Sequence, residues 1–358
     1  MAHIRLENIT KKFGSHTALR NLNLEIADGE FFVLLGQTGA GKTTTLRIVA
    51  GLEKPTEGKV FIDGTDVGEW GAAERDVALV LQQYSLYPRY TVRENLEFPL
   101  KPKIRRVPDD EIRERVAKAA KTLRIEHLLD RKTDKLSGGE MQRVSIGRAI
   151  VRKPRVFLMD EPLSALDAKL RESLRTELKN IQMNLGQTFL FVTHDQIEAM
   201  SMGDKIGVLN NGSLVQVGTP QQVYGSPRNT FVARAVGSPP MNLVNGRVSD
   251  GRAVMAPGFE LPVGANVNGA SDGRPLTFGI RPEDLLVEAG APVAARVHDI
   301  ENHGVEKILT LRVGDEMLRA TVPAQTKVAI EDEVRLAWNP EKLVYFDQAS
   351  GLNLQHAG

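Results

Sequence analysis

Residues 31–44 read FFVLLGQTGAGKTT and decide the fold. The first five of them form a continuous apolar run, as expected of a strand that is buried on both faces. Residues 36–43 fit the pattern G-x-x-x-x-G-K-[ST], and residues 42–50 have the pattern of a helix. A strand, a glycine-rich loop and a helix in this order predict a phosphate-binding loop, because backbone N–H groups and a helix N-terminus attract anionic oxygens.

This loop predicts contacts with a nucleotide. Lys42 supplies a positive charge for the β- and γ-phosphates, and Thr43 offers its hydroxyl to Mg²⁺. The expected ATP contacts of the segment are Gly36, Gln37, Thr38, Gly39, Ala40, Gly41, Lys42, Thr43 and Thr44.

Strands and helices alternate on both sides of the loop. Residues 1–30 read as short strands with turns. Further buried strands are expected at residues 77–82, 156–159 and 189–192, and helices at residues 107–132 and 138–151. This alternation predicts a mainly parallel sheet that is covered on both faces.

Two carboxylates end the strand that begins at residue 156. Asp160 can hold Mg²⁺ through water, and Glu161 can orient and partly deprotonate an attacking water. Two acids at this place could also cap a turn. The phosphate loop upstream favours the catalytic interpretation, because open α/β sheets bind ligands at the carboxyl ends of their strands.

A second anion site is expected where residues 136–140, Leu-Ser-Gly-Gly-Glu, open a helix. At this point the sequence resembles the nucleotide-binding subunits of ABC transporters, whose signature is Leu-Ser-Gly-Gly-Gln. The resemblance runs from Leu6 to about Asn242. It implies an α/β P-loop nucleotide-binding domain over residues 1–236, with a RecA-like core, an antiparallel β subdomain and a helical subdomain at about residues 88–152.

The resemblance also assigns roles to residues. Gln82 matches the Q-loop residue that contacts Mg²⁺ and the γ-phosphate, residues 164–167 match the D-loop, and His194 matches the switch histidine. Phe13 matches the aromatic side chain that stacks on adenine. The resemblance thus implies catalytic roles for Glu161, His194 and Lys42, and Mg²⁺ contacts from Thr43, Gln82 and Asp160. Ser137, Gly138, Gly139 and Glu140 would contact the ATP of an opposing subunit.

A dimer follows from the same resemblance, since the phosphate loop and the signature of one subunit lie too far apart to hold one ATP in this family. Glu140 stands where the signature usually has Gln, and Ala165 where the D-loop often has Asn. These departures leave both a homodimer and a heterodimer with a second ATPase subunit open. The implied partners are two integral-membrane permeases and, indirectly, a solute-binding protein, with this chain peripheral on the cytoplasmic face of the inner membrane.

Residues 237–358 have a different character. Short Val-rich runs separated by turn residues predict a small barrel or sandwich, with strands at 243–248, 276–280, 309–313, 334–338 and 343–346. Residues 237–242 and 279–285 look like the linker and tail motif of carbohydrate-importer ATPases of the maltose and glycerol-phosphate type. The resemblance implies an OB-like (TOBE/MOP-type) regulatory domain and uptake of a sugar, polyol or glycerol-phosphate-like solute, although a purely structural role for the tail stays open.

Composition excludes several classes of protein. The 358 residues contain no cysteine, which excludes disulfides, thiolate metal sites and a cysteine nucleophile. No apolar run approaches the roughly 20 residues that a bilayer requires. Residues 1–235 carry 35 basic and 29 acidic side chains and residues 236–358 carry 11 and 16, a balance too mild to indicate nucleic-acid binding.

Other functions remain as alternatives. A soluble non-transport ABC ATPase, or a regulatory ATP-binding subunit of a heterodimer, would share the phosphate loop. A kinase built on the same loop would not need residues 136–140 or His194. The presence of Glu161 favours a subunit that hydrolyses ATP.

Overall fold

The computed structural model describes residues 2–102, 107–256, 259–262 and 273–356. The chain divides into two compact units, Met1–Pro220 and Gln221–Gly358. Each unit has its own hydrophobic core. The domain boundary expected after residue 236 stays a prediction.

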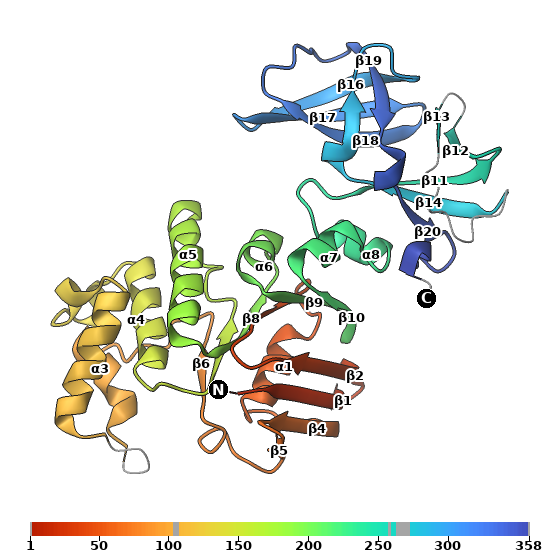
Figure 1. The fold of residues 1–358 in the computed structure, drawn as a ribbon. Coiled ribbons are helices and arrows are strands. Elements are labelled where there is room, and N and C mark those ends of the chain that lie inside the picture. The colour runs from red at the N-terminus through yellow and green to blue at the C-terminus, as the bar shows by residue number, and fades with distance from the viewer. Residues whose placement is uncertain (1, 103–106, 257–258, 263–272, 357–358) are drawn as a thin grey trace. The chain divides into compact units, whose positions relative to one another are not determined.

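The first unit combines strands and helices (Figure 1). Its strands are β1 (Ile4–Phe13), β2 (His16–Ile26), β3 (Phe31–Leu35), β4 (Glu57–Ile62), β5 (Thr65–Asp66), β6 (Val77–Val80), β7 (Val156–Asp160), β8 (Thr188–Thr193), β9 (Lys205–Asn210) and β10 (Ser213–Gly218). Its helices are α1 (Lys42–Val49), α2 (Val92–Glu97), α3 (Asp109–Thr122), α4 (Gly138–Ile150), α5 (Ala168–Leu185) and α6 (Gln196–Met202).

Two sheets organise this unit. The larger has the order β10-β9-β3-β8-β7-β6, and its strands from β9 to β6 run parallel. The smaller is antiparallel, with the order β2-β1-β4-β5. The predicted RecA-like core and antiparallel β subdomain are therefore confirmed. Every residue of β3 and β7 is buried, as the continuous apolar runs predicted.

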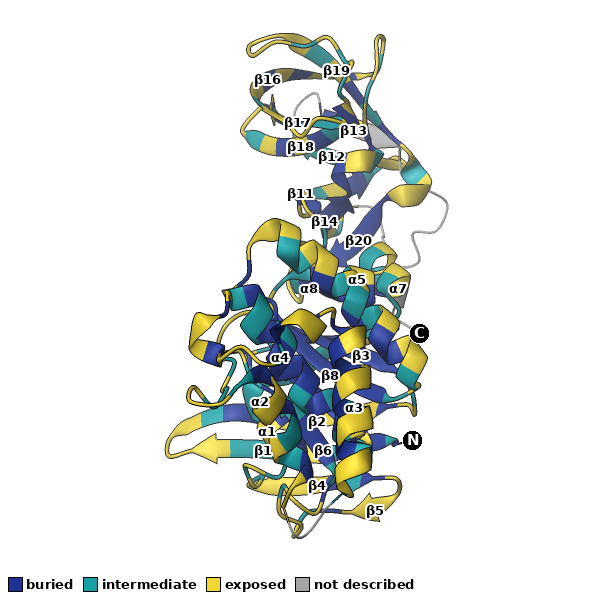
Figure 2. Ribbon diagram, turned by 90° about the vertical axis from the view of Figure 1, so that its left-hand side faces the viewer, coloured by how far each residue is buried: buried dark blue, intermediate teal, exposed yellow. Residues whose placement is uncertain are grey.

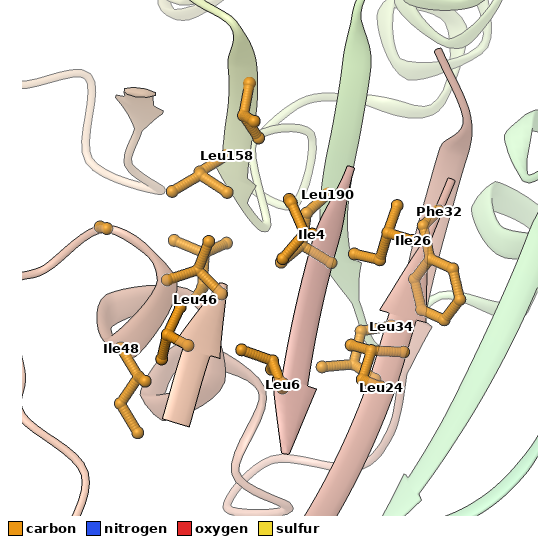
Figure 3. Close-up of a cluster of buried hydrophobic side chains, with 14 of the residues drawn as sticks. Ile4, Leu6, Leu24, Ile26, Phe32, Leu34, Leu46, Ile48, Leu158 and Leu190 are labelled. Atoms are coloured by element: carbon orange, nitrogen blue, oxygen red, sulfur yellow. The ribbon is translucent and has the colours of Figure 1, made fainter. Parts of the chain in front are cut away.

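One hydrophobic core holds the two sheets and α1 together. Figure 3 shows Ile4 and Leu6 of β1 and Leu24 and Ile26 of β2 facing side chains of β3, α1, β7 and β8. The side chains in this cluster are almost fully buried. Because this core fixes β3, β7, β8 and α1 in one body, the loops that leave these elements are held at defined positions.

The outer helices bury one stripe each, as amphipathic helices do. In α3 the buried residues recur at spacings of three and four, namely Ile112, Val116, Ala119 and Ala120. Figure 2 shows the solvent-facing sides of α3 and α5 as exposed and the strands β3 and β8 behind them as buried.

The helix expected at residues 107–132 is shorter than predicted. It begins after Pro108 and ends at Thr122, and Arg124 then adopts a left-handed backbone with φ 55°. Short 3₁₀ turns at Glu126–Leu128 and Thr133–Lys135 follow. The prediction was too long because apolar spacing continues through Leu128, although the backbone has already left the helix.

The second unit begins within α7 (Pro220–Gly225), continues with α8 (Thr230–Ala235) and consists mainly of strands after that. These are β11 (Asn242–Ser249), β12 (Arg252–Ala256), β13 (Phe259–Pro262), β14 (Pro275–Ile280), β15 (Leu285–Val287), β16 (Val293–Asn302), β17 (Glu306–Val313), β18 (Glu316–Pro323), β19 (Glu333–Trp338) and β20 (Val344–Asp347). They form two antiparallel sheets, with the orders β13-β12-β11-β14-β20 and β15-β19-β16-β17-β18.

This architecture confirms the predicted all-β tail. β18 returns beside β15, so the second sheet curls toward a barrel. The five expected strands correspond to β11, β14, β17, β19 and β20. The sequence analysis did not predict the others, among them the long β16 and β18.

The tail motif at residues 279–285 has a visible structural role. The buried Arg281 donates hydrogen bonds to the backbone oxygens of Tyr224 (2.7 Å) and Ala233 (3.2 Å), and its guanidinium lies 3.9 Å from the centre of the Tyr224 ring. Burial lowers the pKa of Arg281. This arginine thus fastens α7 and α8 to the strand β14 within the second unit.

Across the described part of the chain, no helix combines the length and apolarity required to span a membrane.

Candidate functional site

The phosphate loop connects β3 to α1 in the first unit. Gly41, which precedes α1, has φ 106°, and a Cβ at this position would lie 2.7 Å from the backbone oxygen of Ala18. Only glycine fits such a backbone so close to another strand. The loop is thereby held against β2 with the N-terminus of α1 directed at the site.

Lys42 is the first residue of α1, and only 5% of its surface is exposed. Its Nζ donates to the backbone oxygens of Gly36 (2.9 Å) and Gln37 (3.1 Å), so the side chain folds back along the loop. The same Nζ lies 3.1 Å from Oε1 of Glu161. The positive charge of this lysine is therefore concentrated where the loop would bind phosphate.

Asp160 is the last residue of β7 and lies beside the phosphate loop. Its Oδ1 accepts a hydrogen bond of 3.0 Å from Oγ1 of Thr43. Burial raises the pKa of Asp160, the Thr43 hydrogen bond opposes that effect, and the neighbouring charge of Glu161 adds to it. A hydroxyl and a desolvated carboxylate side by side form an oxygen donor set of the kind that Mg²⁺ prefers.

Glu161 follows the strand in an unusual conformation. It has φ 44°, in the left-handed region that a non-glycine residue seldom occupies. Its backbone N–H donates to the oxygen of Val192 (3.0 Å), which fixes it at the edge between β7 and β8. Such strain is maintained by the surrounding structure and often marks a functional position.

The carboxylate of Glu161 bridges two other predicted site residues. Its Oε1 faces Lys42, and its Oε2 lies 2.9 Å from Nδ1 of His194, the residue after β8. Because the partner is a carboxylate, Nδ1 carries the ring proton and donates it, which leaves Nε2 free. The imidazole is about half exposed. One carboxylate thus aligns a cation and an imidazole at the mouth of the phosphate loop.

Gln82 joins the site from the segment after β6. Its Nε2 donates to Oγ of Ser164 (3.2 Å), and Oγ of Ser164 donates to the backbone oxygen of Glu161 (2.9 Å). Consecutive hydrogen bonds therefore link Gln82 of the predicted Q-loop, through Ser164 of the predicted D-loop, to the backbone of Glu161.

An aromatic side chain lines the outer part of the site. Phe13, at the end of β1, is 46% exposed, and Nζ of Lys11 lies 4.8 Å from its ring centre. Its strand partner His16 and the nearby Ala18 of β2 line the same hollow. Sequence reasoning missed these two residues. The pairing of Phe13 with His16 in a hairpin was the signal that could have found His16.

The hollow itself has a volume of about 580 Å³. It is lined by Phe13, His16, Ala18, Thr38, Gly39, Gly41, Lys42, Thr43, Thr44, Gln82, Asp160, Glu161 and His194. Of the remaining predicted contacts in the phosphate loop, Gly36 and Gln37 bind the lysine through their oxygens, and Ala40 is buried in the core.

The signature residues Ser137, Gly138, Gly139 and Glu140 do not line this hollow; they start α4. Oγ of Ser137 accepts from the backbone N–H of Glu140, and Oε2 of Glu140 accepts from the backbone N–H (2.7 Å) and Oγ (2.9 Å) of Ser137. This reciprocal pair is a capping box. The backbone hydrogen bond from Ser137 lowers the pKa of Glu140, so the carboxylate is ionised and turned toward its own helix.

Comparisons with known proteins match both units. The family model described as ABC transporter matches residues 19–164, the MalK OB fold domain matches residues 237–285, and the TOBE domain matches residues 278–346. The trehalose/maltose import ATP-binding protein MalK of Thermococcus litoralis is 47% identical over 98% of this chain and 99% of its own length. The sn-glycerol-3-phosphate import ATP-binding protein UgpC of Ruegeria pomeroyi is 42% identical over 98% and 99%.

This chain belongs to the ABC transporter family. These relatives align over almost their full lengths, and each is named as an import ATP-binding protein. The chain is therefore an importer ATPase of this family, and the non-transport alternative is not supported. Among solved structures, a dimeric post-hydrolysis state of the ATP-binding cassette MJ0796 with ADP and phosphate aligns with a TM-score of 0.55 and 36% identity. That alignment covers 61% of this chain and 98% of the cassette. The predicted ABC cassette with an OB-like tail is confirmed.

Proposed function

We propose that two copies of this ABC ATPase subunit enclose ATP between them and use its hydrolysis to drive uptake of a polyhydroxylated solute. The observation that carries the proposal is the position of Glu161, with its carboxylate 3.1 Å from Lys42 and 2.9 Å from His194. A base, a phosphate-binding cation and a polar imidazole around one point are the parts that hydrolysis of a γ-phosphate requires.

The reaction follows from these contacts. The γ-phosphate enters between the phosphate loop and Glu161 and competes with that carboxylate for Lys42. Glu161, released from the lysine but still held by His194, then accepts a proton from a water that attacks the phosphorus. Nδ1 of His194 continues to donate to Glu161 and orients that carboxylate toward the water. As the water oxygen bonds to the γ-phosphorus, the bond from that phosphorus to the oxygen bridging it to the β-phosphate breaks, and ADP leaves with this oxygen. Glu161 then returns its proton to the inorganic phosphate, which leaves in turn.

Thr43, Asp160 and Gln82 would hold a Mg²⁺ ion. The hydroxyl and carboxylate oxygens of Thr43 and Asp160 already lie 3.0 Å apart, and the side chain of Gln82 lines the same hollow. Bound there, Mg²⁺ would neutralise charge on the β- and γ-phosphates.

Phe13 would stack on the adenine, since its half-exposed ring faces the outer part of the hollow. Stacking on one aromatic ring contributes about 1 kcal/mol, so this contact tunes affinity and does not determine it.

The second copy supplies what the hollow lacks. Its Ser137, Gly138 and Gly139 would present the N-terminus of α4 to the γ-phosphate, since these residues do not line the hollow of their own chain. Support comes from the dimeric form of the MJ0796 cassette with ADP and phosphate. A heterodimer with a second ATPase subunit would satisfy the same geometry.

Transport requires other chains. We infer two integral-membrane permeases, a solute-binding protein and a peripheral position on the cytoplasmic face of the inner membrane, by analogy with the import ATP-binding relatives. The three aromatic rings of Tyr87, Tyr90 and Phe98 lie within 6.2 Å of one another, and the last two are partly exposed. An exposed aromatic cluster so close in sequence to Gln82 is a surface suited to a permease contact.

The solute class is inferred from relatives. Their names specify trehalose or maltose, sn-glycerol-3-phosphate and, for SmoE of Agrobacterium fabrum, sulfoquinovosyl glycerol. Each is rich in hydroxyl groups, so a sugar, polyol or glycerol-phosphate-like solute is proposed here.

The test is the Glu161→Gln variant with ATP and Mg²⁺. Removing the base should lower turnover about 100-fold or more while ATP still binds, so ATP-bound dimers should accumulate in sedimentation experiments. Glu172→Gln, which changes an exposed carboxylate on α5, serves as the matched control. Undiminished hydrolysis by Glu161→Gln would refute the proposed role.

A further inference from the structure

One arginine contacts both loops that carry the proposed catalytic residues. Arg171 lies in the first turn of α5, whose N-cap is Asp167. Its Nη2 donates to the backbone oxygens of Leu166 (3.0 Å) and Ser164 (3.4 Å), and its Nη1 lies 3.4 Å from Oδ2 of Asp195. One guanidinium therefore reaches the loop after β7 and the loop after β8.

These two loops carry Glu161 and His194. The paired strands hold them together only up to the bond between the N–H of Glu161 and the oxygen of Val192. Past this point each loop turns toward its own helix, residues 162–167 toward α5 and residues 194–195 toward α6. Arg171 spans the separation beyond the sheet edge.

Besides the contact of His194 with Glu161, the loop after β8 is held by bonds to its own helix. Oδ1 of Asp195 caps α6 by accepting from the N–H groups of Ile197 (2.7 Å) and Glu198 (3.3 Å). Oγ1 of Thr193 accepts from the N–H of Asp195 (2.9 Å) and donates to the buried Glu198 (2.6 Å). The second oxygen of Asp195 is thus left to bind Arg171, directly beside His194.

The loop after β7 connects onward to the Q-loop. Oγ of Ser164 bonds the backbone oxygen of Glu161 and accepts from Gln82, while the backbone oxygen of Ser164 accepts from Arg171. A shift of this serine would therefore move the backbone of Glu161 and the hydrogen bond of Gln82 together.

We propose that Arg171 is a positioning residue that fixes the loop of Glu161 and the loop of His194 relative to each other. The planar guanidinium of Arg171 divides these contacts between two nitrogens, Nη2 for the loop after β7 and Nη1 for Asp195, and a lysine has only one nitrogen with which to reach both loops. Arg171 does not line the ATP hollow, so its loss should impair the chemical step and leave nucleotide binding intact. The inference rests on the proposed roles of Glu161 and His194.

The experiment compares steady-state ATP hydrolysis by the full chain and its variants. Arg171→Ala should lower kcat about tenfold and change KM for ATP by less than twofold, because a small misplacement of reacting groups slows chemistry strongly. Arg171→Lys should lie between Arg171→Ala and the unaltered chain. Lys169→Ala removes an exposed positive charge from the same turn and should change neither constant.

A double-mutant cycle separates positioning from general stability. Asp195→Asn keeps the oxygen that caps α6 but loses the charge that faces Arg171, and it also serves if Arg171→Ala does not fold. If the two residues act through one contact, the double variant should be no slower than Arg171→Ala alone. The inference is wrong if the fold-losses in kcat of Arg171→Ala and Asp195→Asn multiply in the double variant. It is also wrong if kcat is unchanged in both Arg171→Ala and Arg171→Lys, or if KM rises by the same factor by which kcat falls.

The outcome for Glu161→Gln keeps the two proposals apart. If Glu161→Gln is inactive and Arg171→Ala turns over normally, only the positioning role fails. If Glu161→Gln itself turns over normally, the proposed function fails.

Discussion

The hollow around Lys42 and the signature loop at Ser137 differ in what they present to a ligand. In the hollow, Lys42 and His194 both bind the carboxylate of Glu161, and the neighbouring Asp160 accepts from Thr43. The signature loop presents a helix N-terminus whose serine and glutamate bind each other. Under the proposed function, the first is an assembled centre that receives a further donor for the γ-phosphate, and the second is that donor for another chain. The proposal therefore requires both regions for hydrolysis.

Removing the cation of the hollow should have the largest effect of the changes considered, and this effect should be on ATP affinity. Lys42→Ala leaves Glu161 without its cation and the phosphates without their main charge partner, so ATP affinity should fall about 100-fold or more, as expected for loss of a buried charge contact. Isothermal titration with ATP and Mg²⁺ measures it. Lys54→Ala, which alters an exposed surface pair with Glu69, should retain the affinity of the unaltered chain. If Lys42→Ala still binds ATP tightly, the hollow around Lys42 is not the nucleotide site.

Changing the signature glutamate should affect dimerisation, which depends on the second region. Glu140→Gln keeps an oxygen for the Ser137 N–H but removes a negative charge next to the surface that would meet the partner's ATP. ATP-dependent dimerisation of the Glu161→Gln background should tighten roughly threefold to tenfold, consistent with a partly screened charge. Glu126→Gln, on the 3₁₀ turn after α3, is the control. Weaker dimerisation in Glu140→Gln would show that the carboxylate supports closure.

The adenine contact predicts a smaller change. Phe13→Ala should weaken ATP binding about fivefold, which is the affinity equivalent of about 1 kcal/mol. Phe13→Tyr preserves the ring and should bind ATP like the unaltered chain. If Phe13→Ala leaves affinity unchanged, Phe13 contributes nothing to binding.

A pH-dependent prediction concerns Asp160, and it is the smallest. Burial raises the pKa of Asp160 in the folded chain. The folded state then binds this proton more tightly than the unfolded state, so ionisation of Asp160 destabilises the fold as pH rises past its unfolded pKa of about 4. Asp160→Asn should therefore raise the unfolding temperature at pH 7 by about 2 °C without nucleotide.

The pH dependence provides the control for this stability effect. The gain should vanish well below pH 4, where the carboxyl is protonated in both states. Asp130→Asn, at an exposed carboxylate on the surface, should show no such gain. A lower unfolding temperature in Asp160→Asn at pH 7 would contradict the assigned direction.

Local patterns predicted much of this molecule. The buried strands β3, β7 and β8 were found because each is a short apolar run bounded by turn residues. The sequence also predicted that the loop between β3 and α1 and the two acids after residue 159 belong to one site, and the structure places them around the same hollow. The capping box could have been found too, since Ser137 and Glu140 have the spacing that Thr91 and Glu94 share at the start of α2.

Other features depend on tertiary contacts that no local pattern encodes. The positive φ of Glu161 is imposed by its bond to Val192 on another strand. Arg171 reads in sequence as one more charge on an amphipathic helix, and only the folded chain brings it to Asp195. The end of α3 at Thr122 is likewise set by the left-handed Arg124 and not by apolar spacing.

The most direct test of the account is the ATPase rate per chain as a function of chain concentration, measured together with sedimentation in the same buffer. If catalysis requires two chains, the rate per chain should rise as dimers form, and Ser137→Ala should lower the maximal rate without weakening ATP binding. A constant rate per chain at concentrations where the protein sediments as a monomer would contradict this requirement, since one chain would then suffice for catalysis.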